Sequence, residues 1–177
     1  MTDLNPRISP EQLTPGLSLN SRLETSIANF AAAVVSAKAV DPLITELVRL
    51  RCAQIHDCRL CGSLRNQEAL DEGFDETMQR KIATYENSDF SPEIIAALKL
   101  CDAIILSPML ANNALKEQLN TYFSPQQISE ICLDVMKWSQ QKALVALRIE
   151  APISKDISIL SFDEKGQPHI GGNAYEN

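Results

Sequence analysis

The residue types best suited to chemistry in this chain are two cysteines, Cys58 and Cys61, which stand three positions apart. On a helix, residues at this spacing lie on one face, so the two sulfurs can form a disulfide with little rearrangement. If Cys58 lies in the first turn of that helix, free backbone N–H groups and the helix dipole stabilise its thiolate. A thiolate attacks peroxides and disulfides, and a sulfenic acid on one sulfur condenses with a neighbouring thiol. The spacing alone leaves open whether the pair is reactive or incidental.

Charged and titratable side chains flank this pair in the sequence. Arg59 and Arg65 favour a thiolate, whereas the carboxylate of Asp57 opposes one. His56 can act as a general base beside the thiols, or it can simply form a local hydrogen bond where the preceding helix breaks. These neighbours permit thiol redox chemistry without requiring it.

Glu46 is the second candidate, because it lies at the edge of an apolar helical stripe. A carboxylate in that position either takes and passes a proton or forms an ion pair. Arg49 follows three residues later, which is the spacing of neighbours on one helix face. The periodicity by itself favours the ion pair.

The other three cysteines have apolar neighbours inside expected helices, and small buried side chains account for them better than reactive thiols do: Cys52, Cys101 and Cys132. A structural zinc site needs about four ligands, and this chain offers one close pair with a single nearby histidine. We therefore expect no metal and no cofactor.

The composition is that of one globular domain: 177 residues, 45% hydrophobic and 22% charged. A net charge of −7 argues against nucleic acid and against an anionic membrane surface as partners, since both require a basic face. The start of the sequence has no basic segment followed by an apolar run, and the longest uncharged stretches are too short to span a bilayer. The expected compartment is the cytoplasm, where cysteines are mostly reduced.

The element pattern predicts an all-α fold in three parts: an extended N-terminal arm (1–20), a helical domain (21–150) and a non-helical tail (151–177) with a possible short hairpin. Three helix starts combine a capping side chain with proline: Asp41-Pro42, Ser91-Pro92 and Ser124-Pro125. Helices are expected from residue 21 through the apolar stripe that ends at 34, and over residues 42–55, 57–73, 75–85, 92–106, 113–122 and 125–149.

Residues 46–54, followed by Cys58 and Cys61, resemble the signature helix of the carboxymuconolactone decarboxylase and AhpD-like alkylhydroperoxidase family. The redox branch of that family has a glutamate, eleven intervening residues, a Cys-x-x-Cys pair, and a histidine four positions beyond the second cysteine. Glu46, Cys58 and Cys61 match this spacing. The resemblance extends from about residue 19 to residue 149.

This resemblance implies an AhpD-like helical fold that forms homo-oligomers, often trimers or hexamers, with the site between helices near a subunit interface. It implies reduction of hydroperoxides by the thiol pair, with electrons returned by a disulfide reductant protein. The second cysteine, here Cys61, would attack, and the first, Cys58, would resolve. Glu46 would be the distant base of a proton relay.

One departure changes the expected mechanism, because Arg65 stands where the family has its relay histidine. Arginine stays protonated and cannot act as a base, although it can stabilise a thiolate or sulfenate. Either His56 or water replaces the relay, or the pair serves another thiol exchange. The prediction is a thiol-dependent antioxidant oxidoreductase of the peroxidase or peroxiredoxin type. The alternatives are a redox-sensing or partner-binding oligomer without turnover, and a decarboxylase-like enzyme, whose branch generally lacks the cysteine pair.

Overall fold

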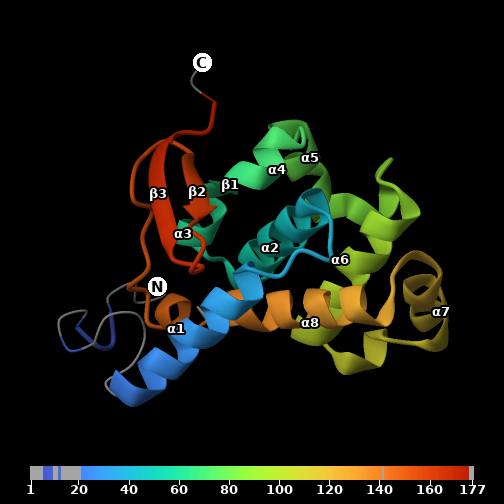
Figure 1. The fold of residues 1–177 in the computed structure, drawn as a ribbon, viewed down its shortest axis with the longest axis horizontal. Helices are drawn as coiled ribbons and strands as arrows, with labels where there is room; N and C mark the ends of the chain where they lie inside the picture. The colour runs from blue at the N-terminus through green and yellow to red at the C-terminus, as the bar shows by residue number, and fades with distance from the viewer. Residues whose placement is uncertain (1–5, 10–11, 13–20, 141, 176–177) are drawn as a thin grey trace, which may run out of the picture.

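A computed structural model describes residues 6–9, 12, 21–140 and 142–175. Of the predicted N-terminal arm, everything except residues 6–9 and 12 lies outside the described residues. The described chain is mostly helical and carries one small three-stranded sheet at one end (Figure 1). Within these residues, no helix is both long and apolar enough to cross a membrane.

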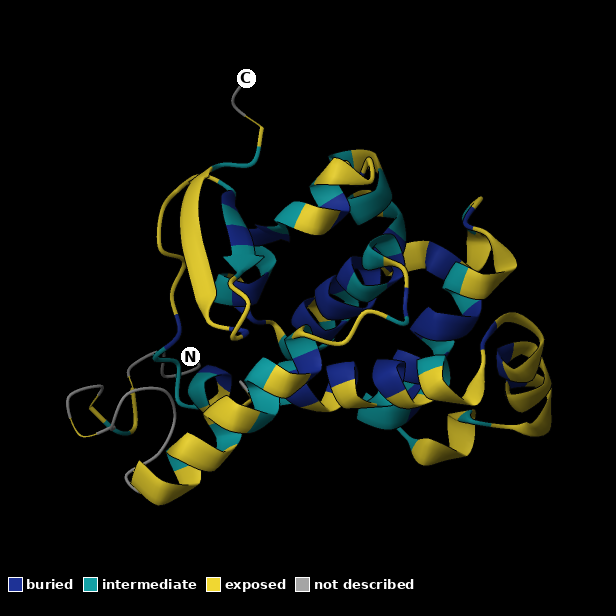
Figure 2. Cartoon of the chain, in the orientation of Figure 1, coloured by how far each residue is buried: buried dark blue, intermediate teal, exposed yellow. Residues whose placement is uncertain are grey.

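The centre of the molecule is helix α2 (Pro42–His56), which packs against α6 (Pro92–Ile105) and α8 (Pro125–Ser139). Figure 2 shows α2 as largely buried, and its apolar side chains, such as Leu47 and Val48, are almost completely excluded from solvent. Burying such side chains is the main favourable term in folding. Helix α7 (Asn113–Tyr122) covers α6, and α1 (Ser21–Val35) crosses α8.

The helix starts follow the expected local signals. The Asp41 side chain accepts the Leu43 N–H at the start of α2, and Ser124 forms a reciprocal capping box with Gln127 at the start of α8. Ser91 occupies the capping position of α6, but its side chain makes no capping hydrogen bond. The predicted helices at 42–55, 92–106 and 113–122 are confirmed to within one residue.

The predicted single helix over residues 57–73 is wrong. The structure has a short helix α3 (Arg59–Gly62), a strand β1 (Leu64–Asn66) and a helix α4 (Gln67–Asp71). Two tertiary contacts hold this arrangement. The guanidinium of Arg49 donates to the carbonyls of Cys61 and Leu64, and β1 pairs with a strand from the distant C-terminal segment.

The predicted helix over residues 125–149 is also divided, because α8 ends at Ser139 and a separate helix α9 covers Lys142–Ala146. The segment expected as one helix from 75 to 85 begins as predicted, with the Asp75 side chain accepting the Met78 N–H of α5 (Glu76–Lys81). It then tightens into a 3₁₀ helix, η2 (Ile82–Asn87). A further 3₁₀ turn, η3 (Pro108–Leu110), precedes α7.

The C-terminal tail contains an antiparallel hairpin of β2 (Ser158–Phe162) and β3 (Pro168–Asn173). Strand β2 also pairs in parallel with β1, with Leu64 opposite Ser158, so the sheet order is β1-β2-β3. The tail therefore adds two strands to the segment directly after the cysteine pair, and β3 forms the exposed outer edge (Figure 2).

Candidate functional site

The cysteine pair lies where the central helix ends and the chain turns. Asp57 adopts a left-handed conformation with φ of 55°, and its N–H bonds back to the last turn of α2. This turn places Cys58 at the N-cap of α3, where its Sγ accepts the Cys61 N–H at 3.2 Å. Cys58 and Cys61 form a disulfide, with their Cα atoms 5.3 Å apart. The two cysteines can therefore form a disulfide, as their spacing predicted.

The disulfide is buried between elements that are distant in the sequence. Cys58 and Cys61 are 5% and 8% exposed, and they pack with Ala53 of α2 and Val145 of α9. A cavity of about 190 Å³ opens beside Cys58. Its described lining residues come from α2, the turn, α3 and α5: Leu50, Ala53, Gln54, Asp57, Cys58, Arg59, Gly62 and Gln79.

Glu46 and Arg49 form the ion pair that the helical spacing favoured. Two hydrogen bonds of 2.6 and 2.7 Å join the carboxylate to the guanidinium, and both residues are 1% exposed. Arg49 also donates to the carbonyl oxygens of Cys61 and Leu64, at 2.7 and 2.5 Å. The pair thus fixes the backbone on the Cys61 side of the disulfide.

Arg65, at the position where the resembled family has a histidine, forms hydrogen bonds with backbone carbonyls and with a carboxylate. Its Nη1 donates to the carbonyls of Gly62 and Leu64 at 2.8 and 2.7 Å, and its Nε and Nη2 donate to Glu76. The Tyr175 hydroxyl, from beyond the hairpin, donates to the same Glu76 oxygen at 2.6 Å. Arg65 therefore ties the end of α3 to α5 and to the C-terminal tail.

His56 ends α2 directly before the turn. Its Nε2 lies 3.0 Å from the hydroxyl oxygen of Ser139 on α8. Burial, reinforced by the positive charge of Lys142, lowers the pKa of His56 to about 4. The imidazole is therefore neutral near pH 7 and is a weaker base than an ordinary histidine.

Glu150 belongs to the site although nothing in the sequence pointed to it. Its carboxylate is buried and accepts the Arg59 side-chain Nε at 3.0 Å and the Arg59 backbone N–H at 3.4 Å. Arg59 also bonds the Glu150 carbonyl. The two residues are 91 positions apart, so a local pattern could not have joined them. Glu150 thereby holds the arginine next to Cys58 in place.

A second unexpected cluster, of buried titratable side chains, lies on α8 near Arg49. Lys137 is 6% exposed, and its Nζ is 2.8 Å from the ring centroid of Trp138, which Arg49 also faces at 5.5 Å. Burial, together with the charge of Arg49, lowers the pKa of Lys137 to about 6. Burial and the charge of Glu130 raise the pKa of Asp134 to about 7.

No family model matches the sequence. Over 135 residues the chain is 36% identical to the uncharacterised protein Rv2313c of Mycobacterium tuberculosis (strain ATCC 25618 / H37Rv), and equally to the uncharacterised protein MT2376 of strain CDC 1551 / Oshkosh. The matched region is 75% of this chain and 48% of each relative. The chain therefore spans about half the length of the curated relatives it matches.

Among solved structures, the fold is similar to that of ATU0492 from Agrobacterium tumefaciens, a protein of unknown function described as a candidate antioxidant defence protein AhpD. The TM-score is 0.68 at 18% sequence identity, over 85% of this chain and all of the other. Such a likeness establishes the fold alone. The chain thus has an AhpD-like, mostly helical fold with a small three-stranded sheet, and a cysteine pair that forms a disulfide.

Proposed function

We propose that this protein is a thiol-dependent antioxidant oxidoreductase that reduces hydroperoxides through a dithiol-disulfide cycle at Cys58 and Cys61. The observation that carries the proposal is the Cys58–Cys61 disulfide, placed at the first turn of α3 beside a cavity. In the oxidising half, one thiolate attacks the peroxide, which releases an alcohol and leaves a sulfenic acid. The second thiol condenses with it, releasing water and forming the disulfide. A dithiol reductant then restores both thiols and becomes a disulfide itself.

The proposed roles of the remaining predicted residues follow from their contacts. Glu46 acts through Arg49, which holds the Cys61 carbonyl, so Glu46 is a positioning residue. Arg65 positions the end of α3 through the Gly62 carbonyl. We propose no proton transfer by His56, because its lowered pKa makes the imidazole a weak base and its Nε2 lies 3.0 Å from the Ser139 hydroxyl.

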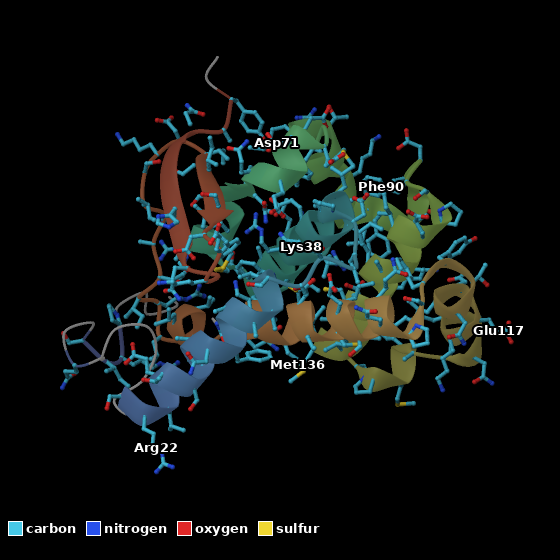
Figure 3. The ribbon with its side chains drawn as sticks, in the orientation of Figure 1. Arg22, Lys38, Asp71, Phe90, Glu117 and Met136 are labelled. Carbon is cyan, nitrogen blue, oxygen red and sulfur yellow. A yellow bond between two sulfur atoms is a disulfide. The ribbon has the colours of Figure 1, made fainter. Side chains whose placement is uncertain are left out.

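The proposed partners are a small-molecule hydroperoxide, a disulfide reductant protein and further copies of this chain. Neither nucleic acid nor a membrane is proposed, in keeping with the net charge of −7. Self-association is supported by apolar side chains on the outer face of α8, where Leu133 and Met136 are 41% and 56% exposed; Met136 projects from the helix in Figure 3. A cytoplasmic location would supply reduced dithiols.

Steady-state consumption of cumene hydroperoxide with dithiothreitol as the reductant tests the proposal. We expect many turnovers per chain in the wild type and none in the double variant Cys58→Ser/Cys61→Ser. Cys132→Ser is the matched control, because this half-buried cysteine is free and lies outside the pair.

Two other results would replace the proposal. Stoichiometric oxidation of the pair without turnover, under dithiothreitol and under a dithiol protein alike, would indicate a redox sensor. If all thiols stay free at every peroxide concentration, the pair takes no part in peroxide chemistry. An incidental pair or a decarboxylase-like enzyme would then be the remaining interpretation.

A further inference from the structure

We propose that Cys58, and not Cys61, is the sulfur that meets both the hydroperoxide and the reductant, and that the cavity lined by Cys58, Gly62 and Gln79 is where they bind. The sequence resemblance implies the opposite assignment, with Cys61 as the attacking thiol. The inference rests on the proposed dithiol cycle and specifies which sulfur reacts first.

Access to the disulfide is the first argument. An attacking group must approach a sulfur along the direction of the bond that it breaks, so the attacked sulfur needs open space beside it. Exposed fractions do not separate the two residues, since both are buried. The cavity of about 190 Å³ does separate them: Cys58 lines it, and Cys61 is not among its described lining residues. Cys61 instead has its carbonyl held by Arg49.

Stabilisation of charge is the second argument. The Cys58 Sγ accepts the backbone N–H of Cys61 at 3.2 Å, and this donor is fixed by the first turn of α3. A backbone donor directed at a sulfur favours its thiolate, which is the nucleophilic form. Among the described residues no corresponding donor to the Cys61 Sγ is found. Cys58 is therefore both the cysteine that lines the cavity and the one whose sulfur has a placed hydrogen-bond donor.

Part of the cavity lining is apolar. Leu50 and Ala53 of α2 contribute to it, which suits the organic substituent of an alkyl hydroperoxide.

The Cys58 thiolate attacks the outer peroxide oxygen, the O–O bond breaks, and the leaving alkoxide takes a proton to become the alcohol. The Cys61 thiol then attacks the Cys58 sulfenic acid, forming the disulfide and water. In the reducing half, a thiolate of a dithiol reductant attacks the Cys58 sulfur, and Cys61 leaves as a thiolate. The second thiol of the reductant then releases Cys58 and completes the reductant's own disulfide.

Gly62 provides a way to close the cavity without breaking the fold. A Cβ built on Gly62 meets no atom within 4 Å, and the residue does not have a positive φ. Gly62→Leu therefore has open space for its Cβ and adds an apolar side chain at the cavity. Gly171 on β3 is a matched control, since a Cβ there also meets nothing within 4 Å.

The deciding experiment treats reduced Cys61→Ser and Cys58→Ser with cumene hydroperoxide and measures intact mass over time. We expect Cys61→Ser to gain one oxygen, mapped to Cys58, at least about tenfold faster than Cys58→Ser gains one at Cys61. In an otherwise wild-type chain, Gly62→Leu should slow disulfide formation by about tenfold, and Gly171→Leu should leave it unchanged.

The outcomes distinguish this inference from the proposed function. If wild type forms the disulfide but Cys58→Ser is the variant that gains the oxygen, or if both variants react equally, the assignment to Cys58 is overturned and the cycle stands. An unchanged rate in Gly62→Leu would likewise remove the cavity from the mechanism. If wild type itself keeps all its thiols, the proposed cycle fails and the assignment fails with it.

Discussion

Two cysteine pairs in this chain have close sulfurs, and only one of them is bridged. Cys58 and Cys61 form a disulfide at the start of α3. The sulfurs of Cys52 and Cys101 lie 3.6 Å apart between α2 and α6, yet both thiols are free. Cys52 lies on α2 and Cys58 lies at the turn directly after it, so the immediate surroundings of the two pairs can be compared.

The surroundings differ in access and in the available donors. Cys52 and Cys101 are 1% and 0% exposed inside the main apolar core. The hydrogen bond with Cys52, followed by burial, raises the pKa of Cys101, which keeps its thiol neutral. Cys58 instead lines a cavity and accepts a backbone N–H. Proximity of two sulfurs therefore does not make a redox site; an open approach and a donor for the thiolate are also required.

Alkylation of the reduced protein gives the largest expected contrast between the pairs. With iodoacetamide near pH 8, we expect Cys58 or Cys61 to react at least about a hundredfold faster than Cys52 and Cys101, because only thiolates with access react. Peptide mapping of a time course measures this ratio. Comparable rates in folded protein would show that burial does not distinguish the pairs.

Removing the charge of Glu46 should disturb the bridged pair through the backbone. Glu46→Gln leaves the buried Arg49 without its counter-charge, which should lower the free energy of unfolding by about 3 kcal/mol. Lys38→Ala is the control, since Lys38 and Glu68 form an ion pair in which both side chains are more than half exposed; it should cost less than about 1 kcal/mol. Urea unfolding of the two variants measures both values. Equal losses of unfolding free energy would contradict the stabilising role of the buried Glu46–Arg49 ion pair.

Cys101→Ala separates a packing role from a redox role. Truncation inside the core should cost about 1–2 kcal/mol of unfolding free energy. Hydroperoxide turnover should remain at the wild-type value, because this thiol lies outside the proposed cycle. Loss of turnover with retained folding would assign Cys101 a part in the chemistry.

A smaller expected effect concerns how the free energy of unfolding changes as the pH falls below neutrality. Because the folded pKa of His56, about 4, is below its ordinary value of 6.5, the unfolded chain binds a proton that the folded chain does not. His56 therefore contributes stability above about pH 6.5 that is lost as the pH falls toward 4. His56→Gln should reduce the loss between about pH 7 and pH 5 by about 1 kcal/mol, measured by urea unfolding. An unchanged pH slope would contradict the lowered pKa.

The sequence predicted those features that depend on near neighbours. The caps at Asp41 and Ser124, the boundaries of α7, the Glu46–Arg49 ion pair and the disulfide all involve residues within four positions of one another. Periodicity and side-chain capping act over this range, so a single sequence contains the information.

The features that were missed depend on residues distant in the sequence. Strand β1 exists because residues 158–160 pair with it, and a helix was the reasonable local expectation. Arg59 is held by Glu150, and Gln79 approaches the cysteine pair from α5. The carbonyl contacts of Arg65 also arise only once the chain has turned into β1. No local pattern encodes these contacts, because the tertiary fold creates them.

The most direct test of the central claim is a free-thiol count on reduced wild-type protein after brief exposure to one equivalent of hydroperoxide, with each cysteine mapped by mass. We expect the free thiols of Cys58 and Cys61 to disappear together into one internal disulfide, while Cys52, Cys101 and Cys132 stay free. If all five thiols remain, or if the disulfide joins Cys52 to Cys101, the assignment of redox chemistry to the α3 pair is contradicted.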